Sequence, residues 1–117
     1  MADNSKIFLE RLSERILILD GAMGTMIQGH KLEREHYHGE HFHDHACDQT
    51  GNNDLLTLSQ PKLISGIHDA FLAAGSDIVE TNTFNSNSVS MADYGLTDKV
   101  VELNRAAAQL ARERTQE

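Results

Sequence analysis

Two short apolar runs, each followed at once by an acidic residue, constrain the fold of this chain more than any other feature. The first run, ILIL at positions 16–19, precedes Asp20, and the second, IV at positions 78–79, precedes Glu80. Branched apolar residues in short runs are typical of strands that are buried on both faces of a parallel sheet. A helical pattern separates the two runs, so the sequence predicts two successive βα units of one parallel sheet.

Helical periodicity marks three segments, at about residues 5–14, 61–74 and 100–111, and the middle one is the pattern that separates the two runs. The middle segment repeats apolar residues at helical spacing, begins with Pro61 in its first turn and is followed by Gly75. Ser59 is the expected N-cap of this helix, and Thr97 or Asp98 that of the last one. A shorter helical turn is expected between about residues 85 and 94.

Composition excludes several classes of protein. A chain of 117 residues and 13.0 kDa forms at most one domain. The net charge of -8 and the pI near 5.2 argue against nucleic-acid or anionic-membrane binding, which require a basic surface. No apolar run approaches the roughly 18 residues of a membrane span. The single cysteine excludes an internal disulfide and fits a reducing compartment, so we expect a cytoplasmic protein.

The residues that follow each predicted strand have the composition of a small-molecule site. A carboxylate, Asp20, is followed by Gly21 and Gly24, and glycine allows the main chain to approach a ligand closely. In parallel sheets such groups meet at the carboxyl ends of the strands, where ligands bind. An ordinary Asp-Gly turn is the alternative, because the glycine spacing matches neither the dinucleotide fingerprint nor the P-loop.

A polar stretch at about residues 28–54 lacks clear periodicity and is rich in histidine. Imidazole and thiolate are good ligands for zinc, copper or nickel, so a small metal-binding module is one hypothesis for this His-rich loop. The alternating spacing, however, matches no standard structural zinc pattern, and we therefore assign no metal ligand here. The residues concerned are His30, His36, His38, His41, His43, His45 and Cys47.

Four blocks of the sequence, LDGAMGTMIQ, GNNDLLTLSQP, AGSDIVETNTFNS and MADYGL, together resemble the start of the cobalamin-dependent methionine synthases. The resemblance runs from about Arg15 to the end of the chain. It implies an α/β fold, namely the N-terminal portion of a (β/α)8 TIM-type barrel with about two βα units and a leading helix. A complete barrel needs roughly 250 residues, so residues 1–117 are expected to be a partial homocysteine-binding domain, truncated before the third strand.

The resemblance implies a homocysteine pocket at the two predicted strand ends. Asp20 is expected to accept hydrogen bonds from the ammonium group of homocysteine, and backbone amides around Gly21 and Gly24 to hold its carboxylate. An alternative for Glu80 and Asn82 is a hydrogen-bonded layer across the barrel mouth, and Thr25 can simply begin a helical turn. No catalytic residue is assigned. The expected substrate-binding residues are Asp20, Gly21, Gly24, Thr25, Glu80, Thr81 and Asn82.

In the family that these blocks resemble, a zinc ion held by three cysteines binds the homocysteine thiol, which then takes a methyl group from methylcobalamin to give methionine. Cys47 does not match that cysteine motif. Zinc and methylcobalamin are therefore expected only in the full-length enzyme, together with downstream folate, cobalamin and activation modules, and this chain alone is expected to be inactive. The alternatives are a betaine- or S-methylmethionine-dependent homocysteine S-methyltransferase, or the small metal-binding module.

Overall fold

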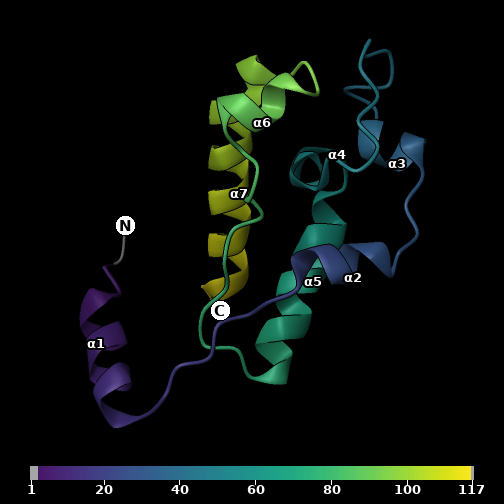
Figure 1. Ribbon diagram of the computed structural model, residues 1–117. Coiled ribbons are helices and arrows are strands. Elements are labelled where there is room, and N and C mark those ends of the chain that lie inside the picture. Colours follow the sequence, from purple (N-terminus) through teal and green to yellow (C-terminus); the bar gives the residue numbers. More distant parts are fainter. Residues whose placement is uncertain (1–2, 117) are drawn as a thin grey trace.

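A computed structural model describes residues 3–116 of the chain, and the elements that it contains are helices (Figure 1). Two of them, α5 and α7, are long; the others are short helices and single 3-10 turns. In chain order they are α1 (Ser5–Glu14), α2 (Met23–Gln28), α3 (Arg34–His38), η1 (Asn53–Leu55), α4 (Leu56–Ser59), α5 (Pro61–Ala74), α6 (Ser88–Ala92), η2 (Thr97–Lys99) and α7 (Val100–Thr115).

The predicted βα portion of a (β/α)8 barrel is wrong for this structure. Within residues 3–116 there is no β-strand, and the two predicted strands meet in one isolated parallel bridge, between Leu19 and Ile78. A parallel sheet is stable when helices cover both of its faces. Here Ile16 is 85% exposed and Ile18 is 56% exposed, so the apolar run of the first segment is not buried. Two isolated segments therefore form a bridge and no sheet.

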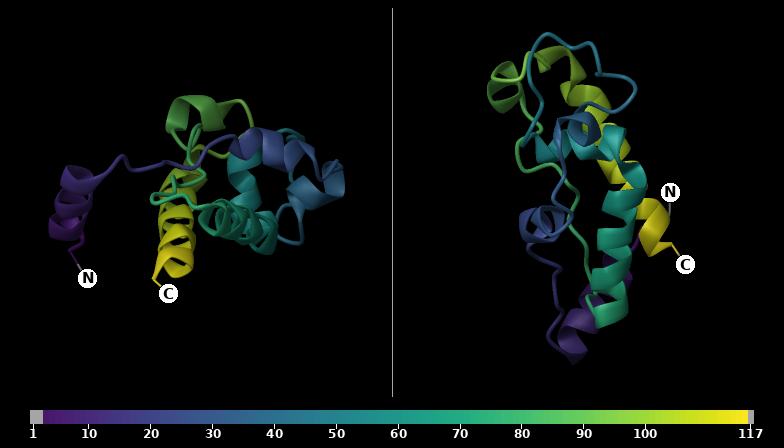
Figure 2. Two further views of the ribbon diagram at one scale, coloured as in Figure 1. Left: turned by 90° about the horizontal axis from the view of Figure 1, so that it is seen from below. Right: turned by 90° about the vertical axis from the view of Figure 1, so that its right-hand side faces the viewer.

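The helices α5 and α7 form the centre of the molecule and lie side by side (Figures 1 and 2). The predicted bounds of α5 are confirmed: Pro61 begins the helix, and Gly75 ends it in the left-handed conformation, with φ of 110°. The predicted cap is wrong, because Gln60 occupies the N-cap position and the Ser59 hydroxyl donates to the Leu55 carbonyl. On the outer edge of the pair, Arg114 of α7 donates two hydrogen bonds, of 2.8 and 3.0 Å, to the carboxylate of Asp69 on α5.

Two apolar clusters hold the short helices against this pair. The first joins α2, α3, α4 and α5, and the second joins the His-rich loop, η1, α6 and α7. Full burial of one such side chain contributes about 1.5–3 kcal/mol, so the clusters dominate the stability of the fold. The buried members are Ile27, Tyr37, Leu56, Ile64 and Ile67 in the first cluster, and Phe42, Leu55, Met91, Leu96 and Leu103 in the second.

The leading helix α1 lies apart from this body, at one end of a molecule that measures 51 × 27 × 22 Å (Figure 2). None of its residues is buried. The segment that joins α1 to the body is held by Arg15, which forms an ion pair with Asp77. Within residues 3–116, no helix has both the length and the apolar character that crossing a membrane requires.

Candidate functional site

A cavity of about 270 Å³ lies between the segments at residues 20–24 and 80–84. The bridge between Leu19 and Ile78 brings these segments together, and the Asp20 N–H donates to the Ile78 carbonyl at 2.9 Å. This single bridge therefore places the carboxyl ends of both apolar runs next to each other. The cavity is lined by Asp20, Gly21, Ala22, Met23, Gly24, Glu80, Thr81, Asn82, Thr83 and Phe84.

The residues that the sequence predicted for substrate binding fall around this cavity, with one difference. Asp20, Gly21, Gly24, Glu80, Thr81 and Asn82 line it, whereas Thr25 is an exposed residue of α2 and does not. Sequence reasoning did not select Ala22, Met23, Thr83 or Phe84. These four lie next to predicted residues in the same two segments. Selecting every residue of each segment would have identified them.

The side chain of Asp20 is nearly enclosed in the cavity wall, with 5% of its surface exposed. Its Oδ1 accepts a hydrogen bond from the Glu80 N–H at 3.0 Å. Its Oδ2 lies 4.0 Å from Nδ1 of His68, a buried residue of α5. The exposed Glu80 adds a second carboxylate to the cavity wall, and two carboxylates favour a ligand that carries a positive charge.

The backbone beside Asp20 has its unusual conformation at an alanine. Ala22 has φ of 36° and ψ of 41°, in the left-handed region that disfavours residues with a Cβ. A Cβ added at Gly21 or Gly24 would meet no atom within 4 Å, so both glycines border open space. Because neither glycine has a side chain, the cavity wall is open at these two positions. Backbone strain often accompanies a functional site, and here it occurs at Ala22.

Asn82 and Asp54 fix the second cavity segment to the short helices η1 and α4. The amide nitrogen of Asn82 donates to the Asn53 carbonyl at 2.9 Å. Asp54 accepts hydrogen bonds of 2.7 Å from the Asn85 N–H and the Ser86 hydroxyl. Burial raises the pKa of Asp54, and these two hydrogen bonds oppose that shift.

A second cavity of about 180 Å³ adjoins the first and shares Met23, Gly24, Asn82 and Phe84 with it. Phe84 is 93% exposed although its ring is large and apolar. Exposed apolar groups at the edge of a polar cavity are typical contact surfaces for a ligand. Phe84 thus presents an exposed apolar ring beside both cavities.

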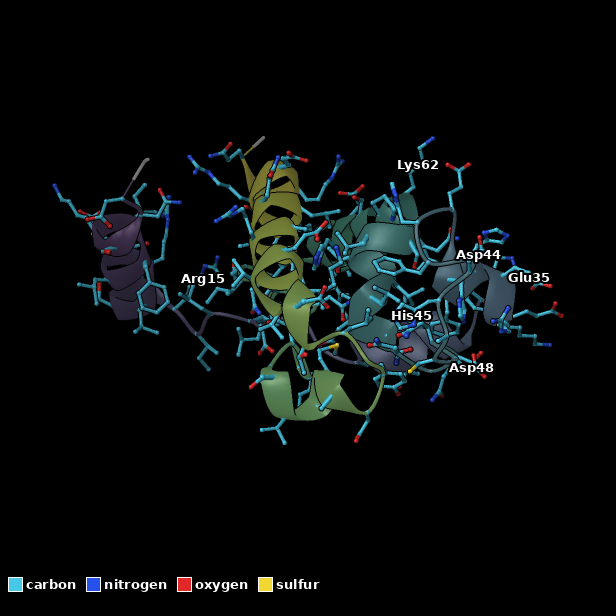
Figure 3. All side chains as sticks on the ribbon, turned by 90° about the horizontal axis from the view of Figure 1, so that it is seen from above. Arg15, Glu35, Asp44, His45, Asp48 and Lys62 are labelled. Carbon is cyan, nitrogen blue, oxygen red and sulfur yellow. The ribbon has the colours of Figure 1, made fainter. Side chains whose placement is uncertain are left out.

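The His-rich loop includes α3, and Figure 3 shows Glu35, Asp44, His45 and Asp48 of this loop on the same side of the molecule. Several of its imidazoles act as internal hydrogen-bonding groups. His38 is 1% exposed; its Nδ1 lies 2.6 Å from the Phe42 carbonyl, and its Nε2 accepts the Gln49 N–H at 3.0 Å. His36 accepts the Glu33 N–H at the start of α3, and His45 accepts the Cys47 N–H. Through these contacts, His36, His38 and His45 stabilise the conformation of the loop.

The donor set of the described residues does not fit a zinc site. Among residues 3–116, no three His, Cys, Asp or Glu side chains are arranged to hold a metal ion. The thiol of Cys47 is in the His-rich loop and packs against Gly95, away from the residues that line the Asp20 cavity.

A sequence model of the homocysteine S-methyltransferase family matches residues 17–117. The matched range begins at Leu17, after α1, and contains every residue that lines the two cavities.

Proposed function

We propose, because the chain belongs to the homocysteine S-methyltransferase family, that the cavity at residues 20–24 and 80–84 binds homocysteine as the methyl acceptor. The observation that carries this proposal is the position of Asp20. Its carboxylate is almost fully buried, is fixed by the Glu80 N–H, and lies in the wall of a cavity of amino-acid size.

Each part of homocysteine has a complementary group in this cavity. The ammonium group binds the Asp20 carboxylate, with Glu80 adding negative charge. The carboxylate lies against the main chain at Gly21 and Gly24, where no side chain blocks its approach. The apolar methylenes and the thiol extend toward Met23 and Phe84, and Thr81 supplies a hydroxyl at the rim. Asn82 supports the site through its bond to Asn53.

Methyl transfer to homocysteine forms a carbon–sulfur bond, breaks the bond between the methyl group and its donor, and releases the thiol proton. The described residues bind and orient the amino-acid end of the substrate, so the groups that activate the thiol are proposed to lie elsewhere in the full-length enzyme. We propose zinc and methylcobalamin as its cofactors, with folate, cobalamin and activation modules on the same polypeptide and a cytoplasmic location. These finer assignments are supported by the resemblance of the four sequence blocks to cobalamin-dependent methionine synthases.

Two of those blocks are in direct contact in the structure. Asn82 of ETNTFNS binds Asn53 of GNNDLL, and Ser86 binds Asp54. The contact supports treating the blocks as one unit, although it does not involve the methyl donor. An assay of the full-length enzyme with methylcobalamin, betaine and S-methylmethionine as alternative donors tests the cobalamin assignment, and methyl transfer from betaine or S-methylmethionine alone would overturn it.

Replacing Asp20 by Asn tests the binding site itself. A hydrogen bond to a charged group contributes about 1.5–3 kcal/mol, so Asp20→Asn should weaken the binding of L-homocysteine roughly ten- to a hundredfold. Calorimetric titration measures this change, with Asp98→Asn, an exposed acidic residue of η2, as the control for lost negative charge. An affinity in Asp20→Asn equal to that of the wild type would remove Asp20 from the site.

A further inference from the structure

His68 of α5 is fully buried, and neither of its ring nitrogens has a hydrogen-bond partner among the described residues. Buried polar side chains in folded proteins almost always have a partner, because an unsatisfied polar atom in the interior is unfavourable. His68 comes directly after Ile67 in the sequence and one helical turn after Ile64, and both isoleucines belong to the first apolar cluster. An apolar side chain would therefore suit position 68 better. The imidazole therefore points to a role beyond packing.

The carboxylate of Asp20 is the functional group next to this ring. Nδ1 of His68 lies 4.0 Å from Oδ2 of Asp20, which is longer than a hydrogen bond but close enough for a small rotation of the carboxylate to form one. The other oxygen of Asp20 is already held by the Glu80 N–H. Asp20 thus lies between a backbone donor on one side and an unpartnered imidazole on the other.

We propose that His68 is a positioning residue for Asp20. When a ligand ammonium occupies the cavity, the neutral ring donates its Nδ1–H to Oδ2 of Asp20 and fixes the carboxylate in the orientation that receives the ammonium. Each carboxylate oxygen can accept more than one hydrogen bond, so Oδ2 can bind the ring and the ligand together. This inference rests on the proposed homocysteine site and adds a residue that does not itself line the cavity.

The charge of the ring sets the direction of the pH dependence. Burial lowers the pKa of His68, while the charges of Asp20 and Asp69 oppose that shift, and Arg114 of α7 pairs with Asp69. The ring is neutral above its lowered pKa, and the Asp20 charge is then free for the ammonium. A protonated ring would compete with the ammonium and repel it. Homocysteine affinity is therefore full above the pKa of His68 and decreases as the pH falls through it.

Three substitutions separate positioning from packing. His68→Asn places an amide near the position of Nδ1, His68→Gln places it near that of Nε2, and His68→Leu has no polar group. We expect His68→Asn to bind L-homocysteine within about threefold of the wild type, and His68→Gln and His68→Leu to bind about tenfold more weakly. His68→Leu should unfold at the same temperature as the wild type or a higher one, because it removes an unsatisfied buried group.

Wild-type affinity in all three variants would overturn the proposal, and so would a loss of affinity that simply parallels a loss of thermal stability. Asp20→Asn, titrated alongside, separates the proposed homocysteine site from the proposed role of His68. If Asp20→Asn binds weakly while the His68 variants bind normally, the homocysteine site stands and the positioning role is refuted. A ligand-free test is the NMR titration of the His68 ring, whose pKa should fall in Asp20→Asn because a neighbouring negative charge is lost. An unchanged pKa would refute the pairing.

Discussion

At the scale of single residues, the aspartates of this molecule differ in what holds them. Asp20 is buried and is bound by a backbone N–H, with His68 on its other side. Asp54 is buried and joins two segments through Asn85 and Ser86. Asp77 lies toward the surface and is paired with Arg15. Asp20 lines the first cavity and Asp54 the second, and both Asp54 and Asp77 connect segments that are distant in the sequence.

Asp77 makes the stability of the protein depend on pH in the acid range. The pKa of Asp77 is lowered from 3.8 to about 2, chiefly by the hydrogen bonds from Arg15 and then by the Ile18 N–H. Because the folded pKa lies below the unfolded one, the stabilisation is complete above pH 3.8 and is lost as the pH falls to about 2. Asp77→Asn should therefore lower the urea midpoint at pH 7 and flatten its decline over this interval.

Urea titrations at a series of pH values measure this effect, with Asp98→Asn as the matched exposed control. If Asp77→Asn and the wild type lost stability in parallel between pH 3.8 and 2, the pairing with Arg15 would not contribute to the acid response.

The residues that sequence reasoning could locate are those defined by their neighbours along the chain. Asp20 and Glu80 were selected because each follows an apolar run, and both line the cavity that forms where those runs meet. The sequence did not predict that His68 is buried or that Phe84 is exposed, because both depend on which surfaces pack together. The conformation of Ala22 was also missed, since left-handed backbone is expected first at glycine.

At the scale of elements, helices with local signals were predictable and strands were not. Pro61 and Gly75 set the ends of α5 through the geometry of their own backbones. A strand, in contrast, needs hydrogen bonds to a neighbouring strand along its length, and residues 16–19 have a single bridge. The helix α3 was missed within the polar stretch, although Glu33 and His36 form a reciprocal cap at its start.

The His-rich loop is an element whose histidines should contribute unequally to stability. His38 is buried and uses both ring nitrogens, so His38→Phe should destabilise the protein by about 1–3 kcal/mol by leaving the Gln49 N–H unsatisfied. His41 and His43 are exposed, and His41→Asn or His43→Asn should change stability by less than about 0.5 kcal/mol.

Chemical denaturation of the three single variants compares these contributions. Equal effects at positions 38, 41 and 43 would contradict the assignment of His38 as the structural histidine of the loop, and a loss of homocysteine binding in His41→Asn or His43→Asn would give the loop a functional role.

At the scale of the whole molecule, the region that matches the homocysteine S-methyltransferase family coincides with the helical body. The match begins at Leu17, and α1, which precedes it, has no buried residue. The two apolar clusters hold α4, α5 and α7 together, and the cavity lies where the segments after the two apolar runs cross this body. The net charge of -8 agrees in sign with a site that receives an ammonium group.

The pairing of Asp20 with the ammonium group of homocysteine can be measured most directly by a thermodynamic cycle. Calorimetry compares L-homocysteine with 4-mercaptobutanoate, which lacks the ammonium group, on the wild type and on Asp20→Asn. Loss of the ammonium should weaken binding to the wild type roughly ten- to a hundredfold, and binding to Asp20→Asn by less than about threefold. An equal loss of affinity in both proteins would contradict the assignment of the ammonium group to Asp20.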